Sequence, residues 1–187
     1  MSDGAQSGRG PVDPVERMKA DAKLLEDFMT CVQQSEEMLL KGGLEAQRAR
    51  DIGFARSLLL LPAWCVVACA VRGAGEDSQP DIKQLSMISV RDAQGKPSAS
   101  LAVFPTAALA DAEAPRMKLP IEGGFWVTLS VPTQNAIAWV RSMGIPSVSV
   151  VALAGANGPS AVLGLDFVEW VAGIEAQQRA AGGESHA

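Results

Sequence analysis

The chain has 187 residues, of which 48% are hydrophobic and 20% charged, a composition that is ordinary for a globular protein and excludes disorder throughout. Its net charge of -5 offers no positive surface to a phosphate backbone, so no nucleic acid partner is expected. The only histidine is His186 and there is no tyrosine, so the commonest general base and metal ligand is missing from the interior of the sequence. We therefore expect no enzyme activity, no metal and no cofactor.

The first residues predict a tail followed by a helix. Residues 1–12 are rich in Gly, Ser and Pro and lack periodicity, so we expect a disordered tail. They also lack the apolar core of a signal peptide. Asp13, Pro14 and Glu16 then supply an N-cap, a first-turn residue and a nearby carboxylate. A helix is predicted from Pro14 to about Lys41.

Residues 13–43 form the predicted N-terminal helical arm, which carries an apolar stripe. Leu25, Phe28 and Val32 recur at intervals of three or four residues, and Gly42-Gly43 ends the helix. Side chains this apolar are costly to leave in water together, so the stripe should contact an apolar surface. Packing on the rest of the chain is one interpretation. A homodimer through this helix, or a helix bound to a partner, is the other.

The next segment predicts a helix and a buried strand. Residues 44–61 have helical character, which Pro62 ends. AWCVVACAV, residues 63–71, is typical of a buried strand, and RGAGEDSQPD, residues 72–81, of an exposed loop. The apolar run around Pro62 is shorter than the roughly 20 residues of a membrane-spanning helix, so no membrane span is expected.

The three cysteines are predicted to be structural. On a strand, Cys65 and Cys69 would lie about 13 Å apart, beyond the ~7 Å limit for a disulfide. They lack the C-x-x-C spacing and histidine partners of a redox or metal site. With Cys31 in a predicted helix, they indicate small buried residues in a reducing compartment, and hence a cytoplasmic protein.

The second half alternates predicted strands and helices without the regular βαβ order of a parallel sheet. The predicted elements are strands 85–90 and 98–104 around a hairpin turn, a short helix 107–113 capped by Thr106, strand 125–131, a helix from Thr133 to Gly144, strand 147–153, a turn at 155–159, strand 160–165, and a last helix capped by Asp166. We expect an α+β fold, with a mixed or antiparallel sheet flanked by helices.

The segment from Leu85 to Val171 resembles the SseB family, named for enhanced serine sensitivity, and in particular its N-terminal-type domain. The resemblance is carried by RDAQGKP, LAVFPTAALADA, NAIAWVRSMGIPSVSVVAL and GPSAVLGLDFVEWV. The chain departs from the family where GANGP stands in place of an Asn-Pro turn. The resemblance implies a non-catalytic accessory domain without active-site residues. Residues 44–178 are expected to form this SseB-like domain, and residues 179–187 a flexible tail.

Four tryptophans give the best candidate for a binding site. Trp64, Trp126, Trp139 and Trp170 all lie in segments expected to reach the core, and burial is the simplest interpretation. Trp139 and Trp170, however, lie beside the centres of their helices' apolar stripes. An exposed tryptophan on a rigid helix is typical of a protein-binding anchor. We therefore predict a protein-binding site at Trp139 and Trp170, flanked by Arg141 and Glu169.

The sequence thus favours a soluble, non-catalytic interaction or accessory protein with a protein partner. A small, acidic, dimeric secretion-type chaperone is the first alternative, because such chaperones share this size, charge and mixture of helices and strands. An enzyme that uses carboxylates or a cysteine is the second. The carboxylates of the chain lie in predicted loops and at predicted helix starts, where solvation and helix capping are sufficient reasons for their presence.

Overall fold

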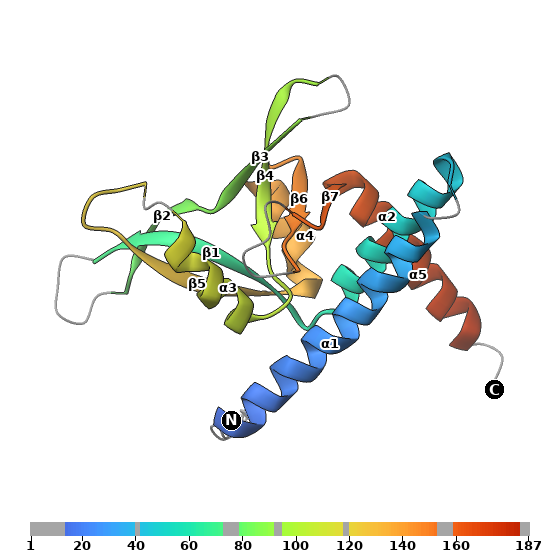
Figure 1. Ribbon diagram of the computed structural model, residues 1–187, viewed down its shortest axis with the longest axis horizontal. Coiled ribbons are helices and arrows are strands. Elements are labelled where there is room, and N and C mark those ends of the chain that lie inside the picture. Colours follow the sequence, from blue (N-terminus) through green and yellow to red (C-terminus); the bar gives the residue numbers. More distant parts are fainter. Residues whose placement is uncertain are drawn as a thin grey trace, which may run out of the picture.

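The computed structural model describes residues 14–39, 42–72, 79–91, 95–117, 120–152 and 159–183. The predicted tail 1–12 and most of the predicted turn 155–159 lie outside these residues. Figure 1 shows the described elements, which in chain order are α1 (Pro14–Leu39), α2 (Leu44–Leu60), β1 (Ala63–Val71), β2 (Asp81–Leu85), β3 (Met87–Arg91), β4 (Pro97–Val103), α3 (Ala107–Glu113), the 3₁₀ turn η1 (Ala114–Arg116), β5 (Phe125–Pro132), α4 (Thr133–Ser142), β6 (Ser147–Val150), β7 (Ala161–Gly164) and α5 (Leu165–Gly183).

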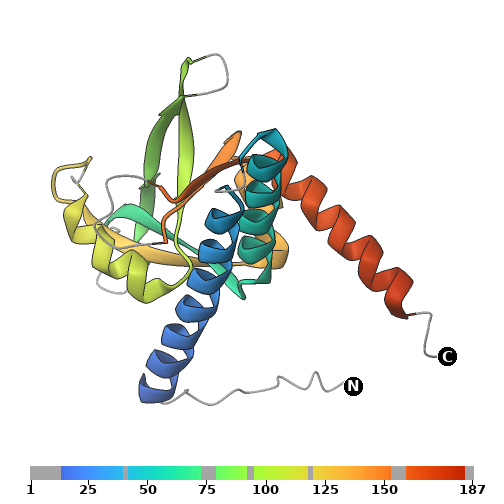
Figure 2. The ribbon, with the colours of Figure 1, turned by 45° about the vertical axis from the view of Figure 1, so that its right-hand side comes forward.

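The described strands form two sheets, which confirms the α+β fold. One sheet has the order β2-β1-β5 and is antiparallel throughout. The other has the order β3-β4-β6-β7 and is mixed, because β4 and β6 are parallel. Helices α1, α2 and α5 lie on one side of the molecule, and α3 covers the three-stranded sheet on another (Figure 1, Figure 2).

Ser86 is the point at which the chain passes from one sheet to the other. Its amide donates to the Val67 carbonyl at 2.8 Å, and its carbonyl accepts from the Ala102 amide at 3.1 Å. Cys65 and Phe104 exchange a second pair of backbone hydrogen bonds between the sheets. The predicted single strand 85–90 is therefore wrong, because Leu85 ends β2 in one sheet and Met87 begins β3 in the other.

The predicted loop 72–81 is also partly wrong, since β2 begins at Asp81. Most residues of β2 are exposed, so the strand lacks the apolar alternation by which a strand is recognised in sequence. Pairing with β1, rather than local pattern, holds it in place. The last helix differs from its prediction as well: α5 continues to Gly183, past residue 179, where the flexible tail was expected to begin.

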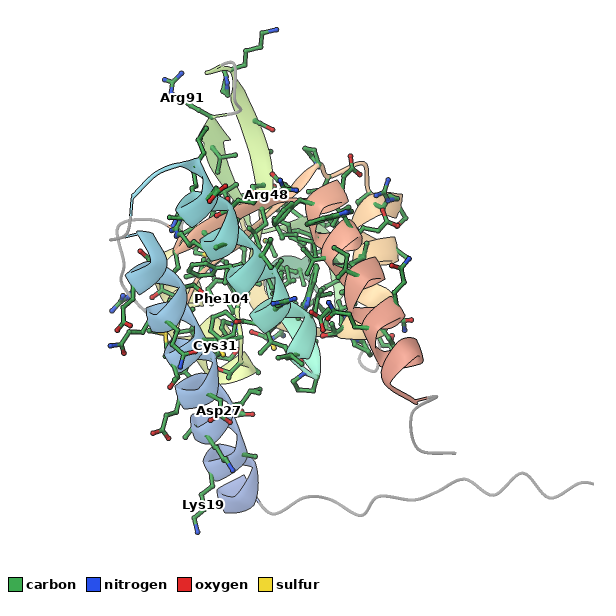
Figure 3. All side chains as sticks on the ribbon, turned by 90° about the vertical axis from the view of Figure 1, so that its right-hand side faces the viewer. Lys19, Asp27, Cys31, Arg48, Arg91 and Phe104 are labelled. Atoms are coloured by element: carbon green, nitrogen blue, oxygen red, sulfur yellow. The ribbon has the colours of Figure 1, made fainter. Side chains whose placement is uncertain are left out.

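The larger core cluster lies between the sheets and helices α1, α2, α4 and α5. Trp64 is fully buried in it, and its indole nitrogen donates to the Leu58 carbonyl at 3.0 Å. A smaller cluster lies beneath α3 and includes Cys65. Cys65 and Cys69 are both buried on β1, as predicted, whereas Cys31 is half-buried on α1 (Figure 3).

The apolar stripe of the N-terminal arm packs on the same chain. Phe28 is 3% exposed and Val32 is also buried in the larger core cluster, which confirms the contact with apolar surface. The helices α1 and α2 come close where Ser35 faces Gly53, since a Cβ atom at Gly53 would collide with the Ser35 hydroxyl. The predicted homodimer through this helix receives no support, because Phe28 and Val32 are already covered by their own chain.

No helix among the described residues combines the length and the apolar character needed to cross a membrane.

Replacing Phe28 by Ala should lower the free energy of unfolding by about 3 to 5 kcal/mol, because it leaves a cavity between α1 and the core. Urea denaturation followed by circular dichroism measures this change. The exposed Gln34 on the same helix is the matched position, and Gln34→Ala should change stability by no more than about 0.5 kcal/mol. Equal midpoints for the two variants would contradict the packing of α1.

Asp51 on α2 should make stability depend on pH. Burial raises the pKa of this carboxyl above its ordinary value of 3.8, and the neighbouring Arg50 only partly opposes the shift. The folded state therefore binds the proton more tightly than the unfolded state. The stability that this protonation gives is complete below the ordinary pKa and is lost as pH rises through the pKa of the folded state.

Asp51→Asn should consequently raise the melting temperature at neutral pH, because the amide avoids the cost of a half-buried charge. The difference from the native protein should shrink as the pH falls through the acidic range, where Asp51 becomes protonated. Thermal unfolding of both proteins across that range tests the sign. A variant that is less stable than the native protein at neutral pH would contradict the prediction.

Candidate protein-binding surface

Helix α5 holds Trp170 at the surface of the molecule. Leu165, Val168 and Val171 are buried in the larger core cluster and fix this part of the helix against the sheet. With about 100° of rotation per residue, Trp170 lies roughly opposite Val168 on the helix. Its side chain is 43% exposed, so a large aromatic ring stands on an anchored helix.

Two neighbours orient the Trp170 ring. The Arg48 guanidinium carbon, from α2, lies 5.5 Å from the ring centroid, within the range of a cation–π interaction. The Phe167 ring lies 5.8 Å away, one helical turn earlier on α5, at an interplanar angle of 31°. Figure 3 shows Arg48 on the stretch of α2 that lies beside α5. Arg48, Phe167 and Trp170 are together called the Trp170 surface below.

An ion cluster borders the Trp170 surface. The Arg141 guanidinium, on α4, donates to Asp166 at 2.9 Å and to Glu169 at 2.5 Å, both on α5. The hydrogen bond that Arg141 donates to Asp166 and the attraction of Glu169 raise the pKa of Arg141 above its ordinary value. All three side chains are solvent-exposed, and their ion pairs can be exchanged for pairs with a partner.

The structure therefore brings together part of the predicted site and separates one residue from it. Arg141 and Glu169 form an ion pair, and Trp170 follows Glu169 on the same helix. Trp139 lies about 200° around α4 from Arg141, so it belongs to a different flank of that helix. It is half-buried and packs against the larger core cluster. Trp139 therefore contacts the core from a flank of α4 that does not carry Arg141, and its role as an anchor stays a prediction.

Sequence reasoning missed Arg48 and gave Asp166 a different role. Arg48 lies in a polar part of α2 that is far from Trp170 in sequence, and no local pattern links the two. Asp166 was expected to cap the last helix, but α5 already begins at Leu165, and the Asp166 carboxylate binds Arg141. One feature of the sequence could have indicated the ion pair with Arg141. Asp166 and Glu169 lie in the first turns of α5, where the helix dipole stabilises carboxylates that an arginine can also bind.

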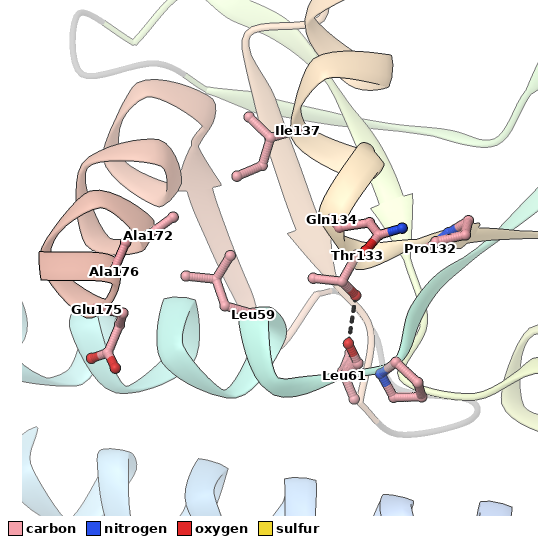
Figure 4. Close-up of a pocket in the computed structure, with 10 residues that line it drawn as sticks. Leu59, Leu61, Pro132, Thr133, Gln134, Ile137, Ala172, Glu175 and Ala176 are labelled. Atoms are coloured by element: carbon pink, nitrogen blue, oxygen red, sulfur yellow. Dashed lines mark hydrogen bonds between the residues drawn. The ribbon is translucent and has the colours of Figure 1, made fainter. Parts of the chain in front are cut away.

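A groove lies between α2, α4 and α5, and Trp170 is not among its lining residues (Figure 4). Its volume is about 580 Å³, within the size range of ligand-binding clefts. The Thr133 hydroxyl donates to the Leu61 carbonyl at 2.5 Å and ties the start of α4 to the end of α2. The groove is lined by Leu59, Leu61, Pro62, Pro132, Thr133, Gln134, Ile137, Ala172, Glu175 and Ala176.

The polar side chains of this groove are few, and two of them are paired within the chain. Its single charged lining residue, Glu175, forms an ion pair with Arg56 at 2.7 Å. The Thr133 hydroxyl is engaged by a backbone carbonyl, so no nucleophile and base meet among the lining residues. Within the described ranges, no group of three His, Cys, Asp or Glu side chains is placed to hold a metal ion.

No protein-family model matches the chain, and a search of curated proteins found no match either.

The two tryptophans of the predicted site should respond differently to truncation. Trp139→Ala should lower the free energy of unfolding by about 2 to 3 kcal/mol, somewhat less than a fully buried aromatic, because only part of the ring contacts the core. Trp170→Ala should cost clearly less, since the side chain is 43% exposed and neither core cluster includes it. Urea denaturation of the two variants in parallel gives the comparison. A larger loss of stability for Trp170→Ala would show that Trp170 is a core residue.

Proposed function

We propose that this protein is a non-catalytic interaction module that binds another protein through the Trp170 surface. The observation that carries the proposal is a tryptophan 43% exposed to solvent on a helix fixed by buried neighbours. Tryptophan buries a large area with only two side-chain torsions to order, which makes it a strong anchor in protein interfaces. Because Arg48 and Phe167 already orient the ring, binding loses little further conformational entropy.

The charges around the ring suit a protein partner with its own mixed polar rim. Arg48 presents one guanidinium beside the ring, and Arg141, Asp166 and Glu169 form exposed ion pairs next to it. An aromatic centre with a polar, hydrated rim is the usual anatomy of a protein interface. The rim sets orientation and association rate, whereas burial of the ring supplies most of the affinity.

The family resemblance and the cellular location expected from the sequence belong to the same proposal. The SseB-like accessory role is part of this proposal and rests on the sequence resemblance over residues Leu85 to Val171. A cytoplasmic location is supported by the burial of Cys65 and Cys69 as structural residues. No described contact favours the secretion-type chaperone or the enzyme over this function.

Affinity purification with the full chain, followed by mass spectrometry, identifies the partner, and calorimetry then measures its dissociation constant. Trp170→Ala should weaken binding by about 2 kcal/mol or more, roughly 30-fold in the dissociation constant. Leu60→Ala is the matched control, because Leu60 is 68% exposed on α2 but lies outside the Trp170 surface. It should bind as the native protein does.

Arg141→Ala should weaken binding less than Trp170→Ala, and mainly through the association rate, which should also lose part of its dependence on salt. Recovery of the same partner with unchanged affinity by folded Trp170→Ala would refute the assignment of the Trp170 surface.

A further inference from the structure

The described sheets have four edge strands, β2 and β5 in one sheet and β3 and β7 in the other. An edge strand presents unpaired backbone amides and carbonyls, which readily pair with a strand of another chain. Natural proteins therefore protect their edges with charges, prolines, bulges or short strands. An edge without such protection is a candidate interface.

Three of the four edges are protected. The strand β2 carries Asp81 and Lys83, which form an ion pair, and its pairing with β1 contains a bulge. The strand β3 ends at Arg91, whose guanidinium donates to the Gly95 carbonyl at 2.8 Å. The strand β7 has only four residues and ends at Gly164.

The fourth edge, β5, has none of these features in its own sequence over most of its length; its neighbours are α3, whose Asp111 accepts from the Thr128 hydroxyl, and η1. Its eight residues, FWVTLSVP, include no charge, and its only proline is the last residue, Pro132. It pairs with β1 in an unbroken register from Ala63↔Pro132 to Ala70↔Phe125, without a bulge. In the part of the chain that the structure describes, its outer side pairs with no other strand.

The side chains of β5 also leave an apolar surface on one face of its sheet. Phe125, Val127 and Leu129 point to the face opposite α3, because they share the register positions of Val131, which packs in the larger core cluster. All three are half-buried, and neither core cluster includes them. Ile82 of β2, 39% exposed, lies on the same face across β1.

We propose that β5 is a homodimer interface, in which two copies of this chain pair their β5 strands antiparallel and join their three-stranded sheets into one of six strands. An antiparallel pair of identical strands has two-fold symmetry automatically, so each copy contributes the same surface. The uncharged sequence places no like charges opposite each other. Phe125, Val127 and Leu129 of one copy then adjoin the same residues of the other and extend the apolar face across the axis.

The mass in solution tests this pairing independently of the Trp170 surface. By size-exclusion chromatography with light scattering, the native protein should have twice the chain mass of 19.5 kDa. Val127→Lys and Leu129→Lys should each reduce the mass to that of one chain, because they place like charges across the axis. Ile82→Lys, with the same charge on the same face but at the other edge, should remain a dimer, as should Trp170→Ala. A native protein of single-chain mass at all micromolar concentrations would overturn the proposal.

A cysteine scan decides the matter if the lysine variants do not fold. Single cysteines at positions 127 to 130, in a Cys31→Ser background, should form a disulfide between two copies at the one position that lies on the two-fold axis. Residues directly opposed in an antiparallel pair have Cα atoms about 4.5 to 5.5 Å apart, within disulfide range. A dimer that forms no such cross-link at any of the four positions would place the interface elsewhere.

Discussion

The fold depends on the burial of β1 on both of its faces. From Trp64 to Ala70 every residue of this strand is buried. Trp64 and Val66 belong to the larger core cluster, and Cys65 and Val67 to the cluster beneath α3. The strand also pairs with β2 on one side and β5 on the other, and Cys65 bonds to Phe104 at the start of the second sheet. Both sheets and both core clusters are thus positioned against one strand. Small residues such as Ala68 and Ala70 leave room for that packing.

The elements that the sequence predicted well are those whose type can be recognised from neighbouring residues alone. The strand at 63–71, the helix capped by Thr106 and the helix that begins at Thr133 agree with β1, α3 and α4. The strand has a continuous apolar run, α3 has a capping residue at its start, and α4 has apolar residues at helical spacing, with Ala136 and Val140 buried. In α3 the Thr106 hydroxyl accepts from the Leu109 amide at 3.2 Å, as the capping pattern predicts.

The elements that the sequence did not predict depend on contacts between distant residues. The division of strand 85–90 at Ser86 is imposed by Val67 on one side and Ala102 on the other, and no local pattern encodes it. The same holds for the candidate site. That Trp170 is exposed followed from its position beside the stripe of α5, whereas the half-burial of Trp139 depends on what packs along both flanks of α4. Arg48 reaches Trp170 only because α2 and α5 lie side by side (Figure 3).

The two proposed surfaces are built from different elements, and this separation has a functional consequence. The Trp170 surface includes no residue of β5, and the three-stranded sheet extends away from α5 (Figure 1), with only the end of β5, at Pro132, reaching the groove beside α5. Pairing through β5 therefore leaves both Trp170 surfaces of the dimer uncovered. A partner with two binding segments, or two copies of a partner held together, would bind such a dimer with the gain that a high effective concentration gives to the second contact. A surface built around one tryptophan, modest in affinity by itself, is then sufficient for a stable assembly.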